Sequence, residues 1–173
     1  SGPDNSSEPI HRASLGAMYV ADRRVWLSTP YFVPTTAALY ALTSAAMRGV
    51  DTRVMIPKKS DSRLVDLAAR SYFEPLLKAG VRVFEYQPRM LHTKALLIDD
   101  AFAILGSANF DNRSFTTNFE MSMAVHEAHI ARELEAVWHE DQSDSIEIPK
   151  NRPRAPFFTR LGQAIARLGS PLL

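Results

Sequence analysis

The chain has 173 residues, of which 46% are hydrophobic and 23% are charged, and its formal net charge is +1. This composition is that of a globular protein and excludes a disordered or fibrous one, and the small net charge provides no general attraction to nucleic acid. The absence of cysteine excludes disulfides and thiolate chemistry, and no apolar run reaches the roughly 18 residues of a membrane-spanning helix.

The first half of the chain alternates between helical and strand periodicity. In chain order, the patterns predict a helix at 9–21, a strand at 23–32, a helix at 35–48, a strand at 52–56, a helix at 61–79 that breaks near Pro75, and a strand at 81–86. Gly49 and Gly80 follow the second and third helices, as expected of helix stops. This order predicts parallel strand pairing with helices on the faces of the sheet. His11 is expected on the surface of the first helix.

The second half is expected to add antiparallel strands. Apolar runs predict strands at 92–100, 102–105 and 119–125, then a helix at 128–140 with an inward side formed by Ile130, Leu134, Val137 and Trp138. We therefore expect an α/β fold with a mixed β-sheet and helices on both faces, formed by a single domain over residues 1–148. Residues 149–173 should form a basic, proline-containing linker and a C-terminal amphipathic helix at 157–168.

The polar side chains that can carry chemistry are concentrated in residues 89–121. They are His92, Lys94, Asp99, Ser107, Asn109 and Glu120. Side chains two apart on a strand share a face, so His92 and Lys94 should point the same way. Asp99 is an odd step from both and should point elsewhere, where it can hold neighbouring backbone or a cation. His92 at the start of a strand reaches the ligand edge of a parallel sheet only if its strand runs antiparallel to its neighbours, which we expect.

This set of side chains suits attack on a phosphodiester. A histidine can attack phosphorus and form a covalent intermediate, and a second histidine can protonate the leaving alcohol and deprotonate the incoming one. An imidazole needs a carboxylate to hold its other nitrogen, and Glu120 is the candidate for His92. Lys94, Asn109 and Ser107 can bind the non-bridging oxygens of the phosphoryl group and stabilise the charge of the transition state.

No metal ion or other cofactor is expected. The carboxylates do not cluster in the way that a Mg²⁺ site needs, so protein cations should take the place of a metal. The segment His126-Glu127-Ala128-His129 is one residue short of the HExxH spacing of zinc proteases, so its histidines do not stack on one helix face. A solvated helix is the better interpretation of this segment.

The spacing of the motif resembles a known one. His92-x-Lys94, four residues, Asp99, then Gly106-Ser107-Ala108-Asn109 and a later Glu120, resembles the HKD motif of the phospholipase D superfamily. The stretches at 28–34, 48–51, 109–115 and 118–120 resemble the bacterial cardiolipin synthases of that superfamily, and the likeness runs over nearly the whole chain. Those enzymes carry two HKD halves, and this chain carries one and resembles the second, C-terminal half.

The resemblance implies a phosphatidyltransferase. A phosphatidyl group would pass through a phosphohistidine from one phospholipid, commonly phosphatidylglycerol, to the hydroxyl of another. In the family the attacking histidine is usually assigned to the first motif, which would make His92 the general acid and base; the sequence leaves both roles open. The implied catalytic residues are His92, Lys94, Asp99, Asn109 and Glu120, and the implied phosphate ligands are Lys94, Ser107 and Asn109.

The implied partners are a phospholipid substrate, a membrane surface, and a second HKD half in the same full-length chain or in a homodimer mate. Because the chain starts with Ser instead of Met, we expect its N-terminus to be a processing boundary. The resemblance implies a location at the bacterial cell membrane, as a peripheral protein or anchored through a missing N-terminal region. The basic residues of the tail are Lys150, Arg152, Arg154, Arg160 and Arg167. The tail helix can lie on an anionic membrane or dock on its own domain or the missing half.

Two other functions stay open. Small single-motif nucleases of the superfamily act as dimers that bring two histidines onto one phosphate, so a homodimeric phosphodiesterase is the main rival. The near-neutral charge argues against it, and nucleic acid is not an expected partner. The other is a half-domain that is inactive alone. Arg89 is either a phosphate contact or a plain surface residue, and Tyr31 and Phe32 either flank the site or belong to the core.

Overall fold

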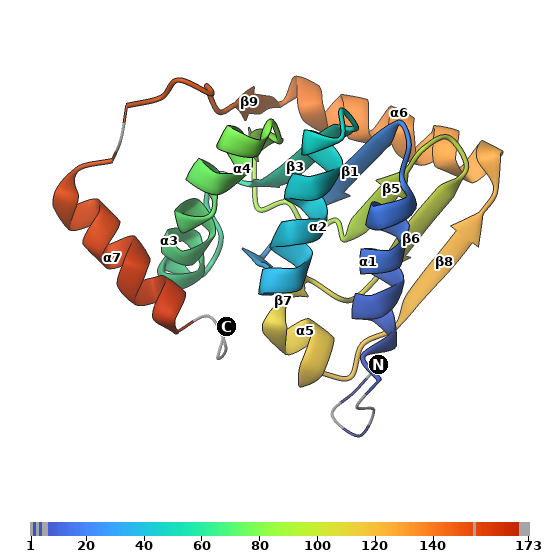
Figure 1. Cartoon of the computed structure of the whole chain (residues 1–173), viewed down its shortest axis with the longest axis horizontal. Helices are drawn as coiled ribbons and strands as arrows, with labels where there is room; N and C mark the ends of the chain where they lie inside the picture. The colour runs from blue at the N-terminus through green and yellow to red at the C-terminus, as the bar shows by residue number, and fades with distance from the viewer. Residues whose placement is uncertain (1, 3, 5–6, 154, 170–173) are drawn as a thin grey trace.

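The computed structural model describes residues 2, 4, 7–153 and 155–169. Its centre is a seven-stranded sheet in the order β8-β6-β5-β1-β3-β4-β9 (Figure 1). The strands are β1 (Arg24–Ser28), β3 (Asp51–Pro57), β4 (Arg82–Tyr86), β5 (Ala95–Ile98), β6 (Phe102–Gly106), β8 (Ser122–His126) and β9 (Ser145–Glu147). Two short strands, β2 (Phe32–Val33) and β7 (Phe110–Asp111), form a separate parallel pair.

The sheet is mixed, as the sequence predicts. Strands β1, β3 and β4 run parallel to one another, whereas β5, β6 and β8 pair antiparallel. Because β5 runs antiparallel to β1, the residues that precede β5 lie at the edge where β1, β3 and β4 end. Open α/β sheets bind ligands at that edge. The antiparallel placement that the motif requires is therefore confirmed.

Helices cover both faces of the sheet. On one face lie α1 (Pro9–Val20), α2 (Thr36–Met47), α3 (Arg63–Ser71) and α4 (Phe73–Ala79), and on the other lies α6 (Ala128–Ser143) (Figure 1). The short α5 (Asn112–Thr116) follows β7, and α7 (Phe157–Leu168) packs against α3. None of the helices in the described part of the chain has the length and apolar character that a membrane span needs.

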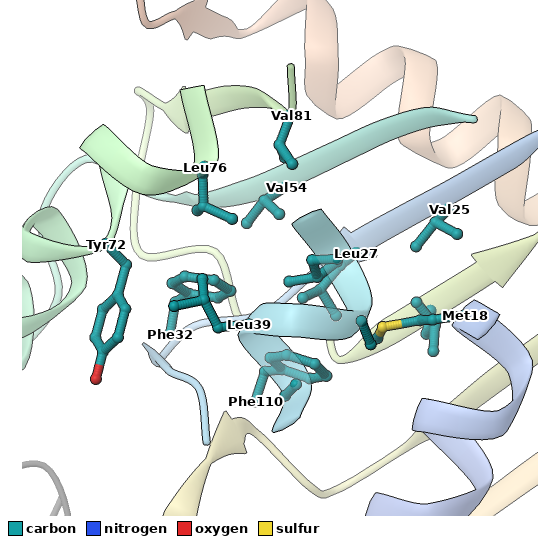
Figure 2. Close-up of a cluster of buried hydrophobic side chains, with 14 of the residues drawn as sticks. Met18, Val25, Leu27, Phe32, Leu39, Val54, Tyr72, Leu76, Val81 and Phe110 are labelled. Atoms are coloured by element: carbon teal, nitrogen blue, oxygen red, sulfur yellow. The ribbon is translucent and has the colours of Figure 1, made fainter. Parts of the chain in front are cut away.

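Strand alternation produces two hydrophobic cores. Val25 and Leu27 of β1 point into the larger core, and Trp26 points to the opposite face. Figure 2 shows the larger core, whose labelled members are Met18, Val25, Leu27, Phe32, Leu39, Val54, Tyr72, Leu76, Val81 and Phe110. On the opposite face Trp26 packs against Trp138 of α6, with ring centroids 5.4 Å apart. Burial of each such side chain stabilises the fold by roughly 1.5–3 kcal/mol.

Several predicted element boundaries are wrong: the strand predicted at 119–125 is β8 (Ser122–His126), and the helix predicted at 128–140 extends to Ser143. Three further differences have a local reason. The helix at 61–79 breaks at Tyr72 instead of near Pro75, because Pro75 lies in the first turn of α4, where a missing N–H breaks no helical bond. The strand predicted at 92–100 contains only Ala95–Ile98, since Asp99 adopts a left-handed φ of 49° and turns the chain. The strand predicted from 23 to 32 stops at Ser28, two residues before Pro30.

Two predicted side-chain positions are also wrong. His11 is buried: its Nδ1 lies 2.9 Å from a Glu8 carboxylate oxygen, its Nε2 lies 2.9 Å from Thr35 Oγ1, and its ring stacks on Phe115. Val137 is exposed, whereas the helical periodicity predicts that it faces inward. Successive helical residues are about 100° apart, so α6 cannot direct both Val137 and its buried neighbour at 138 straight into the sheet.

Candidate active site

The motif residues lie on three segments that meet at one edge of the sheet. Ala95 at the start of β5 pairs with Leu105 near the end of β6, and Gly106 pairs with Ser122 at the start of β8. Two backbone hydrogen bonds extend this row: Gly106 N donates to the Lys94 carbonyl at 3.3 Å, and Ser107 N donates to the Met121 carbonyl at 2.9 Å. The residues before β5, after β6 and before β8 are therefore adjacent.

His92 and Lys94 lie in contact. Lys94 Nζ is 3.2 Å from His92 Nδ1 and 3.4 Å from Nε2, and it donates to the His92 carbonyl oxygen at 3.0 Å. An ammonium can donate only to a ring nitrogen that carries no proton. Burial lowers the pKa of Lys94, and the carboxylates of Glu120 and Asp111 act in the opposite direction. The imidazole of His92 is exposed, so a substrate or a partner can reach it.

Glu120 is oriented by neighbouring polar side chains. Ser107 Oγ donates to Oε2 of Glu120, and Asn118 Nδ2 lies 3.5 Å from Oε1. Met121 N donates to Ser107 Oγ at 3.1 Å, which holds the serine in turn. Ser107, predicted as a phosphate ligand, thus also positions the carboxylate. The predicted contact between Glu120 and the imidazole of His92 stays a prediction.

Gly106 allows β6 and β8 to approach closely enough for the contact between Ser107 and Glu120. A Cβ added to Gly106 would lie 2.6 Å from the Cα of Ser122 and would also meet the Met121 carbonyl. Both neighbours are backbone atoms in a paired strand, so they cannot move without disturbing the pairing. The motif therefore requires glycine at position 106 for a steric reason, in addition to the turn that glycine allows there.

Asn109 is positioned by a buried turn that the sequence reasoning missed. Its N–H donates to Ser114 Oγ at 3.1 Å, and the N–H of the fully buried Ser114 donates to the Asp111 carboxylate at 2.7 Å. Phe110 N donates to Thr29 Oγ1 at 3.0 Å. Burial raises the pKa of Asp111, although the bonds from Ser114 oppose this. The signal was present in the sequence, since Asp is among the residues preferred at the position before a helix, where Asp111 caps α5.

The side-chain amide of Asn109 has an unfilled bond. Its Oδ1 is buried and has no hydrogen-bond partner within the described residues. A buried polar atom without a partner costs about 1–3 kcal/mol, and such groups are retained where an external group supplies the missing bond. Because Oδ1 is an acceptor, a donor group of a ligand or of a second protein surface would supply the missing bond.

Asp99 lies at the far end of β5 from His92. Its carboxylate accepts from the backbone N–H groups of Arg23 at 2.8 Å, Arg24 at 3.0 Å and Asp22 at 3.2 Å. Desolvation alone would raise the pKa of Asp99, but these backbone donors outweigh it, and the net shift is downward. The carboxylate ties the β5–β6 turn to the start of β1, which is the backbone-holding role that strand alternation predicts.

The remaining candidates fall into different environments. Phe32 is a core residue, 1% exposed. Tyr31 Oη donates to Asp61 at 2.6 Å, and burial together with this bond raises the pKa of Tyr31 to about 12. Arg89 lines an open hollow with Lys58. Within the described residues, no cluster of three or more histidine and carboxylate side chains can hold a metal ion.

The sequence matches a known protein family and is similar to several curated proteins. Residues 15–141 match the family described as "Cardiolipin synthase, PLD-like domain". The chain belongs to this PLD-like family. It is 42% identical over 174 residues to Cardiolipin synthase A of Pseudomonas putida and 41% identical over 174 residues to Cardiolipin synthase A of Pseudomonas aeruginosa. Each match covers 100% of this PLD-like chain but only 36% of the relative.

Solved structures share the fold of this PLD-like chain. Phosphatidylserine synthase of Haemophilus influenzae superposes with a TM-score of 0.74 at 11% identity, over 95% of this chain and 45% of that one. Nuc of Salmonella typhimurium, a phospholipase D family member, superposes with a TM-score of 0.70 at 20% identity, over 79% of this chain and 89% of that one. At these identities the likeness shows the fold alone, and it confirms the predicted α/β architecture.

Proposed function

We propose that this chain is the C-terminal catalytic half of a cardiolipin synthase-like phosphatidyltransferase. The observation that carries the proposal is the 42% identity to Cardiolipin synthase A along the whole chain. The enzyme would move a phosphatidyl group from one phospholipid, with phosphatidylglycerol as the first candidate, to a hydroxyl of another. Since the chain spans 36% of the length of that relative, the second motif would be supplied from outside it.

The reaction would run as two displacements at phosphorus. In the first, an imidazole nitrogen forms a bond to phosphorus, the bond to the leaving glycerol oxygen breaks, and a second imidazole donates the proton. In the second, the acceptor oxygen bonds to phosphorus, the phosphorus–nitrogen bond breaks, and the hydroxyl proton passes to the second imidazole. Lys94 and Asn109 would hold the non-bridging oxygens, and His92 would be the proton carrier.

A second HKD half would fit the open side of the motif. His92 is exposed, and apolar side chains on either side of Glu120 are exposed too: 75% for Phe119 and 81% for Met121. The neighbouring β8 is an edge strand of the sheet. Covering this region would remove apolar surface from water and would bring a second histidine opposite the first.

The substrate class can be tested directly. With its first half present, this chain should convert labelled phosphatidylglycerol into cardiolipin, detected by thin-layer chromatography, and should leave labelled DNA intact. The rival function is a homodimeric phosphodiesterase, and the observation in its favour is that the chain matches 89% of Nuc, a protein of similar size. Cleavage of DNA by this chain alone, lost on His92→Ala, would overturn the lipid assignment.

We also propose that α7 contacts an anionic membrane. This helix packs on α3 with the small Ala166, which is 2% exposed, and with Arg167, whose guanidinium lies 4.6 Å from the Tyr72 ring centroid. Its large apolar side chains instead face solvent: Phe157, Phe158, Leu161, Ile165 and Leu168. The helix therefore buries the small Ala166 and exposes its large apolar side chains, the reverse of an ordinary core helix.

The positive charges of residues 148–173 favour an anionic lipid surface as the partner that covers the exposed apolar side chains of α7. Residues 148–173 contain no acid, and Lys150, Arg152, Arg160 and Arg167 line a hollow of about 530 Å³ between α7 and the α3–α4 region. Arg154, the other basic residue of the tail, lies outside the described residues. An amphipathic helix with basic flanks binds anionic bilayers through both its apolar area and its charge.

Substitution in α7 should weaken membrane binding. The double change Phe158→Glu and Leu161→Glu should lower flotation with phosphatidylglycerol-containing vesicles at least about tenfold, because two inserted side chains are lost. The matched control is Val20→Glu with Met47→Glu, which places the same charges at other exposed apolar positions and should float normally. Equal flotation of the two variants would contradict the membrane role and favour docking of α7 on protein.

A further inference from the structure

We propose that a basic hollow beside the motif binds the phosphate diester of the acceptor lipid. The inference rests on the proposed function, because it assigns one group of that substrate to one place on the chain. The hollow has a volume of about 570 Å³ and lies between the loop after β3 and the segment after β4. Its lining includes Lys58, Lys59, Asp66, Arg70, Arg89 and Met90.

The hollow lies at the same edge of the sheet as His92. Lys58 follows β3 and Arg89 follows β4, and the chain then continues through His92 into β5. In the sheet order, β3 is two strands from β5, a separation of roughly 10 Å at ordinary strand spacing. Arg89 and His92 are three residues apart, so their Cα atoms are separated by at most roughly 11 Å.

The hollow has an excess of positive charge. Arg70 donates to the Lys58 carbonyl at 2.6 Å and to the Glu85 carboxylate at 3.1 Å, so its charge is matched by an acid. Lys58, Lys59 and Arg89 form no salt bridge with any residue that the structure describes. Asp141 of α6 interacts electrostatically with Arg89. Lys58, Lys59 and Arg89 therefore line one open space in which Asp66 is the acidic member of the lining, and the balance of charge is positive.

The loop that carries the lysines is held by its backbone. Lys58 N donates to the Tyr86 carbonyl at 2.9 Å, and Ser60 N donates to the Asp66 carboxylate at 3.1 Å. The hydroxyl of Ser62 accepts from Val65 N and caps α3. Because the backbone is fixed while the ammonium groups reach solvent, an anion can bind without first ordering the loop.

The acceptor lipid presents two groups that the enzyme must recognise. One is the terminal hydroxyl, whose oxygen bonds to phosphorus while the phosphorus–nitrogen bond breaks and the proton passes to the second imidazole. The other is the phosphate diester of the acceptor, which a three-carbon glycerol separates from that hydroxyl. With the hydroxyl at the motif, a phosphate bound by Lys58, Lys59 and Arg89 would hold the acceptor at the same edge of the sheet as His92. Water has no such group, so the hollow would favour transfer over hydrolysis by holding the acceptor in place.

Loss of the two lysines should change the partition between products. In the two-half enzyme, Lys58→Ala with Lys59→Ala should lower the ratio of cardiolipin to phosphatidic acid about tenfold, the effect of losing charge-assisted bonds to the acceptor. Lys58→Arg with Lys59→Arg keeps the charge and should restore the ratio. The matched control, Arg12→Ala with Arg132→Ala, removes two positive charges from exposed helix positions and should leave the ratio unaltered.

Glycerol, a neutral acceptor, distinguishes the loss of a site for the acceptor's phosphate from a general loss of transfer activity. The ratio of transfer to hydrolysis with glycerol as the acceptor should not follow the fall seen with phosphatidylglycerol, because glycerol carries no phosphate. If both ratios fall together, or if the cardiolipin ratio stays within twofold of the unsubstituted enzyme, the assignment of the hollow is wrong.

Direct binding tests the hollow even if the unsubstituted enzyme makes no cardiolipin. Glycerophosphoglycerol, the soluble headgroup, should shift the backbone amide NMR signals of residues 58–60, 87, 89 and 90 in this chain, and the double alanine variant should weaken binding about tenfold. A headgroup site binds this probe more tightly than inorganic phosphate. Equal affinities would mark a plain anion site, and unshifted signals would contradict the proposal.

Discussion

Replacement of His92 by alanine should lower the rate of phosphatidyl transfer by about 10²–10⁴-fold, the usual effect of removing a general acid–base group. The imidazole is exposed at the sheet edge and lies against Lys94 Nζ, so the substitution removes the proton carrier without opening a cavity in the core. Initial rates of cardiolipin formation by the two-half enzyme provide the measurement. His129→Ala, an exposed histidine on α6, is the control and should retain the rate.

The same variant assigns the role of the histidine. If His92 is the proton carrier, labelled donor lipid quenched in base should leave the label on a histidine of the first half, and His92→Ala should still accept it slowly. If His92 is the attacking group, the label should be on His92 and disappear on substitution. A variant that keeps more than a tenth of the rate would show that His92 does not take part in the chemistry.

Replacement of Asp99 by alanine should destabilise the fold by about 2 kcal/mol, because three backbone N–H groups lose their acceptor. The expected loss is no larger because this carboxylate is partly exposed, and solvent weakens each of its bonds. Alanine also tolerates the left-handed φ of 49° less well than Asp or Asn. The midpoint of thermal unfolding should fall by roughly 4–8 °C for a chain of this size, as measured by circular dichroism.

The pH dependence of this loss follows from the pKa of Asp99. Because the folded pKa lies below its unfolded value, the stabilisation is present above about pH 4 and is lost as pH falls through the folded pKa. The difference between the unsubstituted chain and Asp99→Asn in free energy of unfolding should therefore shrink in acid. Asp22→Asn, at an exposed carboxylate in the neighbouring α1–β1 loop, should change stability by less than about 0.5 kcal/mol.

These measurements also separate two interpretations of the motif aspartate. The resemblance places Asp99 with the catalytic residues, whereas the hydrogen bonds give it a role in holding β1 against the β5–β6 turn. If the second interpretation holds, loss of activity in Asp99→Ala should track the loss of folded protein. If Asp99→Ala is as stable as the unsubstituted chain but inactive, Asp99 takes part in catalysis.

Local spacing explains why much of the architecture could be predicted. Thr35 and Ser62 accept bonds from helix N–H groups at their own helix starts, and Gly80 ends α4 with a positive φ; each needs only neighbours within a few residues. Strand alternation placed Trp26 opposite Val25 and also turned Asp99 away from His92. These features depend on the periodicity of helices and strands, which can be recognised from the order of apolar and polar residues.

The order of residues by itself determined the strands and helices in outline, the mixed sheet and the grouping of His92, Lys94, Asn109 and Glu120 along three strand ends. Only the tertiary structure decided that Ser107 bonds to Glu120, that His11 is buried and that α7 turns its apolar side chains outward. Periodicity states which side chains share a face, but the partner that a face meets is set by packing between distant segments. In α7 the small Ala166 packs close to its neighbour, and that contact leaves Phe158 and Leu161 in solvent.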